Sequence, residues 1–300
     1  MPARNTINVL VVSLSLLAAC SSGEAPSGAS SATGSTAMPT GPTATSSPSP
    51  SEVEDPLASI EVEVDGRVLW GECSGEAEDG ETTVVLDAGL GNTGSHLALI
   101  STEVQAFTRV CTYSRAGLGS SDPAAGSRSL DDLVEDLHAF LDVGDVPGPY
   151  VLVGQSLGGS VVLRFAQAHP EEVAGVVSMN PVLPYSDWIE RAAKVETKDE
   201  LQTYEIGFYE GANDESVDLR DTDALLEVPF PVEIPYVVMY AEDCAGEFCD
   251  RIRPVLEAAT ADLADLNELG TFISVKGAGH EIFGTHLDDV VAEIEALTEA

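Results

Sequence analysis

Six short apolar runs rich in valine and isoleucine recur through the chain and constrain its fold more than any other feature. They lie at residues 82–89, 108–114, 149–154, 174–181, 234–241 and 271–278. Continuous apolar runs of this length are typical of strands buried on both faces of a parallel sheet. Helical patterns separate the runs, so we expect an α/β protein with a doubly wound sheet. Ligand chemistry should then lie at the carboxyl ends of the strands.

Two further segments have readable local signals. Residues 59–73 are two alternating runs about Asp65-Gly66, which predicts a type I′ β-hairpin. Residues 129–142 place leucine and valine on one helical face and begin with Ser129 and Asp132, the spacing of a capping box. With the hairpin, the predicted sheet has about eight strands.

The N-terminal segment predicts export. Residues 1–19 combine an arginine with an apolar stretch that is too short to cross a hydrocarbon core about 30 Å thick. The stretch ends in Leu17-Ala18-Ala19-Cys20, which resembles the lipobox of bacterial lipoproteins. That resemblance implies cleavage before Cys20, a lipid on its thiol, and anchoring to the outer face of the cell membrane. An uncleaved or ordinarily cleaved signal with an incidental cysteine is the alternative.

The composition changes abruptly after the signal. Residues 20–56 are mostly serine, threonine, alanine, glycine and proline, which predicts a flexible tether because few apolar side chains are available to offset its ordering entropy. Residues 57–300 suit one large α/β domain. Within it, residues 182–233 interrupt the alternation of strands and helices, and we expect them to form a cap.

Charge limits the choice of partner. The chain has 51 acidic and 13 basic side chains, a formal net charge of -38. Such a field disfavours nucleic acid, anionic lipid surfaces and anionic substrates. Solubility outside the cell, or tolerance of high salt, is the simpler reason for the acidity. We expect a monomer that acts on a small neutral molecule.

Four cysteines remain when Cys20 is set aside. An even number in an oxidising compartment favours disulfides, and we predict the pairs Cys73–Cys111 and Cys244–Cys249. A metal site in residues 243–250, DCAGEFCD, is the alternative. It is disfavoured because no histidine lies near and the C-x4-C spacing is unusual for zinc. We therefore expect no metal.

The glycine-rich turn in residues 84–96, VVLDAGLGNTGSH, has two interpretations. Gly89, Gly91 and Gly94 have the G-x-G-x-x-G spacing of a dinucleotide site. That site would want an acidic residue at the end of the next strand, where the chain has Ser114 and Arg115. Nicotinamide cofactors are also not expected outside the cell. A turn whose backbone donates to an oxyanion is favoured, with no cofactor.

A serine nucleophile is predicted at the end of residues 149–154. Residues 154–158 read Gly-Gln-Ser-Leu-Gly, and the small residues allow the sharp strand-to-helix turn that exposes a nucleophilic serine. The bare pattern is weak in a chain rich in glycine and serine. Its position between a buried strand and a helix makes Ser156 a strong candidate, because the helix dipole favours negative charge there.

The base and the orienting acid should follow the serine along the chain. His280 comes after the last strand in a Gly-Ala-Gly turn, whereas the other four histidines are better explained as packed or solvated side chains. Asp243 ends the preceding strand and is the first choice for the orienting acid, with Glu242 as the second. Asn180 is set aside, because an amide does not stabilise an imidazolium as a carboxylate does.

From about residue 59 to the C-terminus the chain resembles the α/β-hydrolase superfamily. The motifs VVLDAGLG, YSRAGLGSS, GQSLGG, YAED and GAGH stand in that family's order and spacing. The resemblance implies that Ser156 is the nucleophile, His280 the general base and acid, and Asp243 the orienting acid. It also implies that the backbone N–H groups of Leu157 and Leu90 form the oxyanion hole. The chain departs from the common family pattern at Ala88, Ser114 and Gln155.

A carboxylic-ester hydrolase is the favoured function. Aromatic side chains within residues 182–233 suggest an apolar entrance for a neutral ester, although each one taken singly is better explained as packing. An amidase or proline-type exopeptidase on the same fold is second, and a catalytically idle surface-binding lipoprotein is third. Ser156 itself disfavours a metal hydrolase or a dehalogenase with an aspartate nucleophile.

Overall fold

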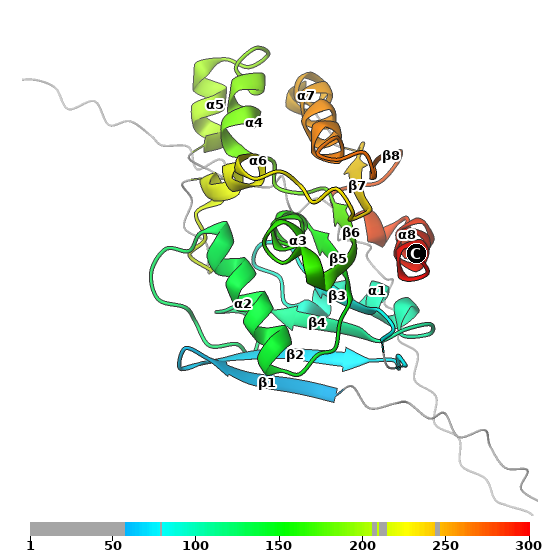
Figure 1. The fold of residues 1–300 in the computed structure, drawn as a ribbon. Coiled ribbons are helices and arrows are strands. Elements are labelled where there is room, and N and C mark those ends of the chain that lie inside the picture. The colour runs from blue at the N-terminus through cyan, green and yellow to red at the C-terminus, as the bar shows by residue number, and fades with distance from the viewer. Residues whose placement is uncertain (1–57, 79, 206–208, 210–214, 244–246) are drawn as a thin grey trace, which may run out of the picture. The chain divides into compact units, whose positions relative to one another are not determined.

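Eight strands form one mostly parallel sheet in the computed structural model (Figure 1), in the order β1-β2-β4-β3-β5-β6-β7-β8. The structure describes residues 58–300 except 79, 206–208, 210–214 and 244–246. β1 pairs with β2 and β2 pairs with β4 in antiparallel fashion, whereas the other neighbouring strands are parallel. The strands are β1 (Ala58–Val64), β2 (Arg67–Ser74), β3 (Thr83–Asp87), β4 (Val110–Ser114), β5 (Tyr150–Gln155), β6 (Val173–Met179), β7 (Tyr236–Ala241) and β8 (Gly270–Val275).

Helices cover both faces of this sheet. The α-helices are α1 (Ala98–Val104), α2 (Leu130–Val143), α3 (Leu157–Ala168), α4 (Tyr185–Ala192), α5 (Lys198–Tyr204), α6 (Ala224–Glu227), α7 (Glu247–Ala264) and α8 (Leu287–Thr298). Short 3-10 helices are η1 (Gly94–Leu97), η2 (Pro170–Glu172), η4 (Leu219–Asp223) and η5 (Ile282–Gly284). Figure 1 shows α2 and α3 on one side of the sheet and α1 with α8 on the other. The predicted doubly wound α/β fold of eight strands is confirmed.

The sheet is buried on both faces, which explains the continuous apolar runs. Side chains alternate across a strand, so neighbours in β3 enter different cores. Val85 packs into the core beneath α2, α3 and α7, whereas Leu86 packs into the core beneath α1 and α8. A strand with two buried faces does not alternate buried and exposed residues, and every residue of β3, β4, β5 and β7 is buried.

Both local predictions are confirmed. β1 and β2 form a hairpin in which Asp65 has φ 51° and Gly66 has φ 75°, the positive values that a type I′ turn requires. Ser129 caps α2: its hydroxyl accepts from the Asp132 N–H at 3.0 Å, and the Asp132 carboxylate accepts from the Ser129 N–H at 2.8 Å. These reciprocal bonds satisfy two N–H groups that the first turn would otherwise leave unpaired.

The segment between β6 and β7 departs from simple alternation. It contains α4, α5, η4 and α6, and α4 packs against α7. Its residues 215–218 return to the body of the domain. There Arg128 donates its N–H to the Ser216 carbonyl and accepts from the Asp218 N–H, both at 2.9 Å. The segment is therefore tied to the loop that precedes α2.

The disulfide between Cys73 and Cys111 is confirmed. These residues lie directly opposite each other on β2 and β4, with Cα atoms 4.1 Å apart. The second predicted bridge depends on Cys244, and that residue lies outside the described part of the chain. Residues 1–57, which contain the predicted signal, Cys20 and the tether, also lie outside it. No helix among the described residues is long and apolar enough to span a membrane.

Candidate active site

Ser156 lies at the sharp turn between β5 and α3. Its backbone has φ 56° and ψ -117°, a conformation that is strained for a non-glycine residue. The turn is held at both sides: the Ser156 N–H donates to the Met179 carbonyl at 2.9 Å, and its carbonyl accepts from the Val182 N–H at 3.2 Å. This is the geometry of a nucleophile elbow, which presents the serine hydroxyl at the carboxyl edge of a sheet.

Two glycines make this turn possible. A Cβ atom on Gly154 would overlap the Gly158 carbonyl, and one on Gly158 would overlap the carbonyl oxygens of Asp87 and Ala88. The elbow therefore brings β5, α3 and the end of β3 into contact through backbone alone. Larger residues at either glycine would force these three elements apart.

The glycine-rich turn after β3 lies beside the elbow. A Cβ atom on Gly89 would be 3.3 Å from the Ser156 Cβ, and it would also overlap the Gln155 side-chain oxygen. The peptide that joins Gly89 to Leu90 is therefore next to the serine. Leu157, the other predicted oxyanion donor, follows Ser156 directly and is fully buried as the first residue of α3.

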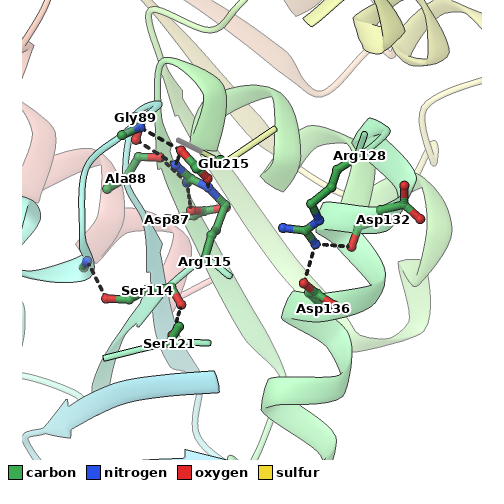
Figure 2. Close-up of polar contacts among 12 residues, drawn as sticks. Asp87, Ala88, Gly89, Ser114, Arg115, Ser121, Arg128, Asp132, Asp136 and Glu215 are labelled. Atoms are coloured by element: carbon green, nitrogen blue, oxygen red, sulfur yellow. Dashed lines mark hydrogen bonds and ion pairs between the residues drawn. The ribbon is translucent and has the colours of Figure 1, made fainter. Parts of the chain in front are cut away.

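A buried arginine holds the glycine-rich turn (Figure 2). Arg115 follows β4, and its guanidinium donates to the Ala88 carbonyl at 2.5 Å and to the Gly89 carbonyl at 2.7 Å. It also donates to the carboxylates of Asp87 at 2.5 Å and of Glu215 at 2.5 and 2.9 Å. Both carboxylates are buried as well. Charge-assisted hydrogen bonds from a buried side chain thus fix the backbone of the glycine-rich turn.

Asp87 and Glu215 balance the positive charge of Arg115. Burial opposes the charge on Arg115, but Asp87 and Glu215 outweigh it, and the arginine pKa lies above its ordinary value. Burial raises the pKa of Asp87, although Arg115 counteracts part of that effect. Glu215 has the bidentate geometry that suits a guanidinium best.

His280 lies in the turn after β8, and its ring contacts Asn180 at the end of β6. The Asn180 Nδ2 is 2.6 Å from the His280 Nδ1. The amide orientation follows from its other contact, because the Asn180 Oδ1 accepts from the Ala241 N–H at 3.3 Å. The amide nitrogen therefore faces the ring and donates to Nδ1, which leaves the ring proton on Nε2.

Burial lowers the pKa of His280 below its ordinary value of 6.5. The Glu281 carboxylate raises the same pKa and His96 lowers it, but both effects are smaller than that of burial. Burial therefore favours the neutral imidazole, which is the charge state that a general base needs.

The predicted acids lie near the turn that carries His280 without reaching its ring. Asp243 is exposed, and its N–H donates to the Ala278 carbonyl at 2.9 Å. Glu242 accepts from the Ser274 hydroxyl at 2.9 Å. Neither carboxylate hydrogen-bonds His280 in the part of the chain that the structure describes.

The structure thus brings the predicted residues together only in part. Ser156 lies beside Gly89 and follows Gln155, which pairs with Met179 in β6. Asn180 is the next residue after that strand, and its side chain holds His280. Ser156 and His280 therefore converge on the end of β6, although no hydrogen bond joins them within the described residues. Catalytic hydrogen bonds are often long in unliganded enzymes and tighten with substrate.

Comparison with known proteins identifies the architecture. Residues 90–204 match the family described as alpha/beta hydrolase fold. The enol-lactonase from Burkholderia xenovorans LB400 superposes with a TM-score of 0.56 at 18% identity, covering 80% of this chain and 100% of that protein. A proline iminopeptidase from Mycobacterium smegmatis superposes with a TM-score of 0.60 at 16% identity, covering 81% of this chain and 98% of that protein. The chain has an α/β-hydrolase fold.

The curated proteins that are similar in sequence match only part of the chain. The uncharacterized protein YqjL from Bacillus subtilis is 29% identical over 101 residues, which is 34% of this chain and 40% of that protein. The chain spans less than half the length of the curated relatives it matches first. Similarity at this level supports the fold and leaves the substrate to be inferred from the site.

One group of potential metal ligands lies apart from Ser156 and His280. His138 on α2, His169 at the end of α3 and Glu172 come close enough together to be considered. The two imidazole rings are stacked, with centroids 3.9 Å apart and planes 5° from parallel. A metal ion lies in the plane of each imidazole that binds it, so two parallel stacked rings do not share one ion in this arrangement.

The described aromatic residues of segment 182–233 pack mostly in the hydrophobic core. Trp188, Tyr209 and Phe230 are buried in the core beneath α2, α3 and α7. Tyr185 contacts the Tyr209 ring edge to face at 4.8 Å. The packing interpretation of single aromatics fits these contacts, and Tyr185 is the partly buried member of the group.

Two residues that shape the site are not among the residues predicted from the sequence. Asn180 is excluded there as the orienting acid, but its side chain bonds to the His280 ring. Its position at the end of a strand is the sequence feature that could have indicated this. Glu215 was one carboxylate among many in its segment. No local pattern in the sequence separated it from the others.

Proposed function

We propose that this chain is a serine hydrolase that cleaves small neutral carboxylic esters through an acyl-enzyme. The observation that carries the proposal is the strained backbone of Ser156, φ 56°, between a buried strand and α3 with Gly89 beside it. Backbone strain of this kind persists where the surrounding structure fixes it, and it is concentrated at functional sites. The acidity of the chain supports a neutral rather than an anionic substrate.

The proposed reaction has two half-reactions. The Ser156 hydroxyl attacks the acyl carbon while His280 Nε2 accepts its proton, and the N–H groups of Leu157 and Leu90 stabilise the oxyanion. The C–O bond then breaks, and the leaving alcohol takes the proton from His280. Water attacks the acyl-enzyme in the same way, with His280 as base, and releases the acid and free Ser156.

For this cycle His280 must carry its resting proton on Nδ1, and a carboxylate must accept the hydrogen bond from that atom. We assign this role to Asp243, whose backbone is joined to the His280 turn at Ala278. Asp243 would take the place that the Asn180 amide holds in the resting structure. Glu242 is a weaker candidate because Ser274 already donates to it.

The choice between esters and amides rests on the site and on fold similarity alone. The structural neighbours include an enol-lactonase and a proline iminopeptidase, so the same architecture supports both reactions. We favour esters because an alcohol is a better leaving group than an amine and depends less on protonation by His280, whose ring is bonded to the Asn180 amide.

Matched substrates test the proposal directly. Residues 57–300 should hydrolyse p-nitrophenyl acetate or butyrate, and the corresponding p-nitroanilides should react far more slowly. Ser156→Ala and His280→Ala should each abolish ester turnover while near-UV circular dichroism stays unchanged. Anilides turning over faster than esters would make the chain an amidase or exopeptidase. Full ester turnover in either variant would contradict the proposed mechanism.

We also propose that the chain is exported and held at the outer face of the membrane by a lipid on Cys20. The apolar stretch followed by Leu-Ala-Ala-Cys supports this. Intact mass of protein extracted from membranes should correspond to a chain that begins at a diacylated Cys20. A chain that begins at Met1, or an unmodified Cys20, would contradict it.

A further inference from the structure

The buried contact between Glu215 and Arg115 links the segment after β6 to the proposed oxyanion donor. Glu215 accepts from Arg115 Nε and Nη2 at 2.5 and 2.9 Å, and its Oε1 also accepts from the Gly91 N–H at 2.7 Å. Only 1% of Arg115 and 2% of Glu215 is exposed. A single carboxylate therefore holds both the arginine and the backbone of the glycine-rich turn (Figure 2).

Arg115 in turn fixes the plane of one peptide. Its Nη2 donates to the Gly89 carbonyl at 2.7 Å, and the Asn92 N–H donates to the same oxygen at 3.1 Å. In a trans peptide the C=O and N–H point in opposite directions. The Gly89 carbonyl points toward Arg115. The Leu90 N–H of the same peptide therefore points away from Arg115.

The guanidinium also acts on the strength of that donor. A positive charge on a carbonyl oxygen polarises the whole amide, and hydrogen bonds in a chain strengthen one another in a low-dielectric interior. The Leu90 N–H is therefore a better donor when Arg115 occupies the Gly89 carbonyl. Asp87 and Glu215 keep the arginine charged and in place, and they raise its pKa above the ordinary value.

We propose that Glu215 and Arg115 are positioning residues that orient and polarise the Leu90 N–H for oxyanion stabilisation. This inference rests on the proposed function. It connects residues 215–218, which are bonded to the backbone of Arg128, to the glycine-rich turn. Neither residue contacts the reacting atoms, so each acts through the peptide of Gly89 and Leu90.

Glu215→Gln is the principal variant, because it keeps the length and one acceptor oxygen but removes the charge. We expect kcat for an activated ester to fall by about 10- to 100-fold, since one oxyanion donor is worth on the order of 10² to 10³ in rate. KM should stay within about twofold, because an oxyanion forms only in the transition state. Arg115→Lys should act in the same direction, because a single ammonium group lacks the planar fork that reaches both carbonyls.

Glu196→Gln is the matched control. Glu196 is a buried carboxylate between α4 and α5 that accepts from Arg251 Nε at 3.2 Å and from Arg251 Nη2 at 2.9 Å. This ion pair involves neither Arg115 nor Arg128. The variant therefore removes a comparable buried charge without touching the proposed donor. Its melting temperature should fall, whereas its kcat per titrated site should match that of the wild type.

A transition-state mimic separates positioning from a purely structural role. A phenylboronic acid forms a tetrahedral adduct on an activated serine, and its inhibition constant should weaken in Glu215→Gln by the same factor as kcat. All rates are expressed per active site, counted by fluorophosphonate titration, so that unfolded protein does not contribute.

The outcomes are distinct. Wild-type kcat and unchanged boronate inhibition in titrated Glu215→Gln and Arg115→Lys would overturn the inference and leave the proposed function standing. An equal loss of kcat per site in Glu196→Gln would also overturn it, since the effect would then be one of general packing. Wild-type protein that neither labels with fluorophosphonate nor cleaves esters would overturn the proposed function and the inference together.

Discussion

The side-chain nitrogen of Asn180 lies 2.6 Å from Nδ1 of His280, at the place where a Ser-His-Asp hydrolase has its carboxylate. Because the Asn180 oxygen accepts from the Ala241 N–H, the amide donates to the ring and keeps the ring proton on Nε2. That tautomer does not accept a proton from serine. A base in a Ser-His-Asp triad needs the other tautomer, in which Nδ1 carries the proton.

Asn180→Asp should raise ester turnover. An aspartate at this position accepts a hydrogen bond from Nδ1 and selects the active tautomer, so kcat should increase about tenfold or more; the reverse change in a serine protease costs about 10⁴. The measurement is kcat per titrated site for a p-nitrophenyl ester. A lower kcat in well-folded Asn180→Asp would contradict the tautomer argument, and Asn180→Ala controls for simple loss of the amide.

Asp243→Asn tests which carboxylate serves in the native protein. If Asp243 takes over Nδ1 during turnover, the variant should lose about 10² to 10⁴ in kcat. The same change made in the Asn180→Asp background should cost far less, because the new aspartate already supplies the carboxylate. Equal losses in both backgrounds would show that Asp243 acts independently of the Nδ1 position.

The pH dependence of turnover follows from the burial of His280. Its pKa lies below 6.5 because burial disfavours the charged ring, and Glu281 only partly offsets this. The base must be neutral, so the acid limb of kcat/KM should have its midpoint below pH 6.5. A profile over about pH 4 to 8 measures it, and a midpoint above 6.5 would contradict the burial argument.

The lowered pKa of His280 also makes the free energy of unfolding depend on pH. An unfolded histidine binds its proton near pH 6.5, whereas buried His280 binds it only at lower pH. As pH falls from 6.5 through the folded pKa, the unfolded state gains protons first, and the free energy of unfolding decreases. His280→Gln should flatten this part of the stability curve, as followed by urea unfolding at several pH values.

Gly158→Ala should destroy the elbow. The added methyl group would overlap the carbonyl oxygens of Asp87 and Ala88, and we expect a loss of about 3 kcal/mol in the free energy of unfolding. Fluorophosphonate labelling of Ser156 should fall with it. Gly284→Ala is the control because a Cβ there meets no other atom within 4 Å. Equal stability of the two variants would contradict the packing described for the turn.

The Cys73–Cys111 disulfide should stabilise the domain substantially. It closes a loop with a sequence separation of 38, for which loop entropy predicts about 4 kcal/mol. Cys73→Ala with Cys111→Ala, or the wild type under reducing conditions, should unfold at correspondingly lower denaturant concentration. Matching midpoints for oxidised and reduced wild type would contradict this.

Much of the fold was predictable because its signals are local. The type I′ turn at Asp65-Gly66, the capping box at Ser129 and the elbow around Ser156 each depend on a few adjacent residues. The parallel sheet followed from runs that are apolar at every position. Periodicity of this kind reports which faces are buried, and burial decides the layers of an α/β domain.

The contacts that tune the site were not predictable in the same way. Asn180 and His280 are 100 residues apart in sequence, and so are Arg115 and Glu215. Strand order places β7 between β6 and β8, and the residues that follow β6 and β8 meet beyond the end of β7. Which side chain makes the contact depends on rotamers and amide orientation. No sequence pattern encodes those choices, and only the assembled structure shows them.

The proposed mechanism depends above all on Ser156 being an activated nucleophile. The intact mass of residues 57–300 after exposure to a fluorophosphonate probe, with Ser156→Ala beside the wild type, tests this. We expect one adduct on the wild type and none on the variant. A folded wild-type domain that forms no adduct, or a variant that labels equally well, would contradict it.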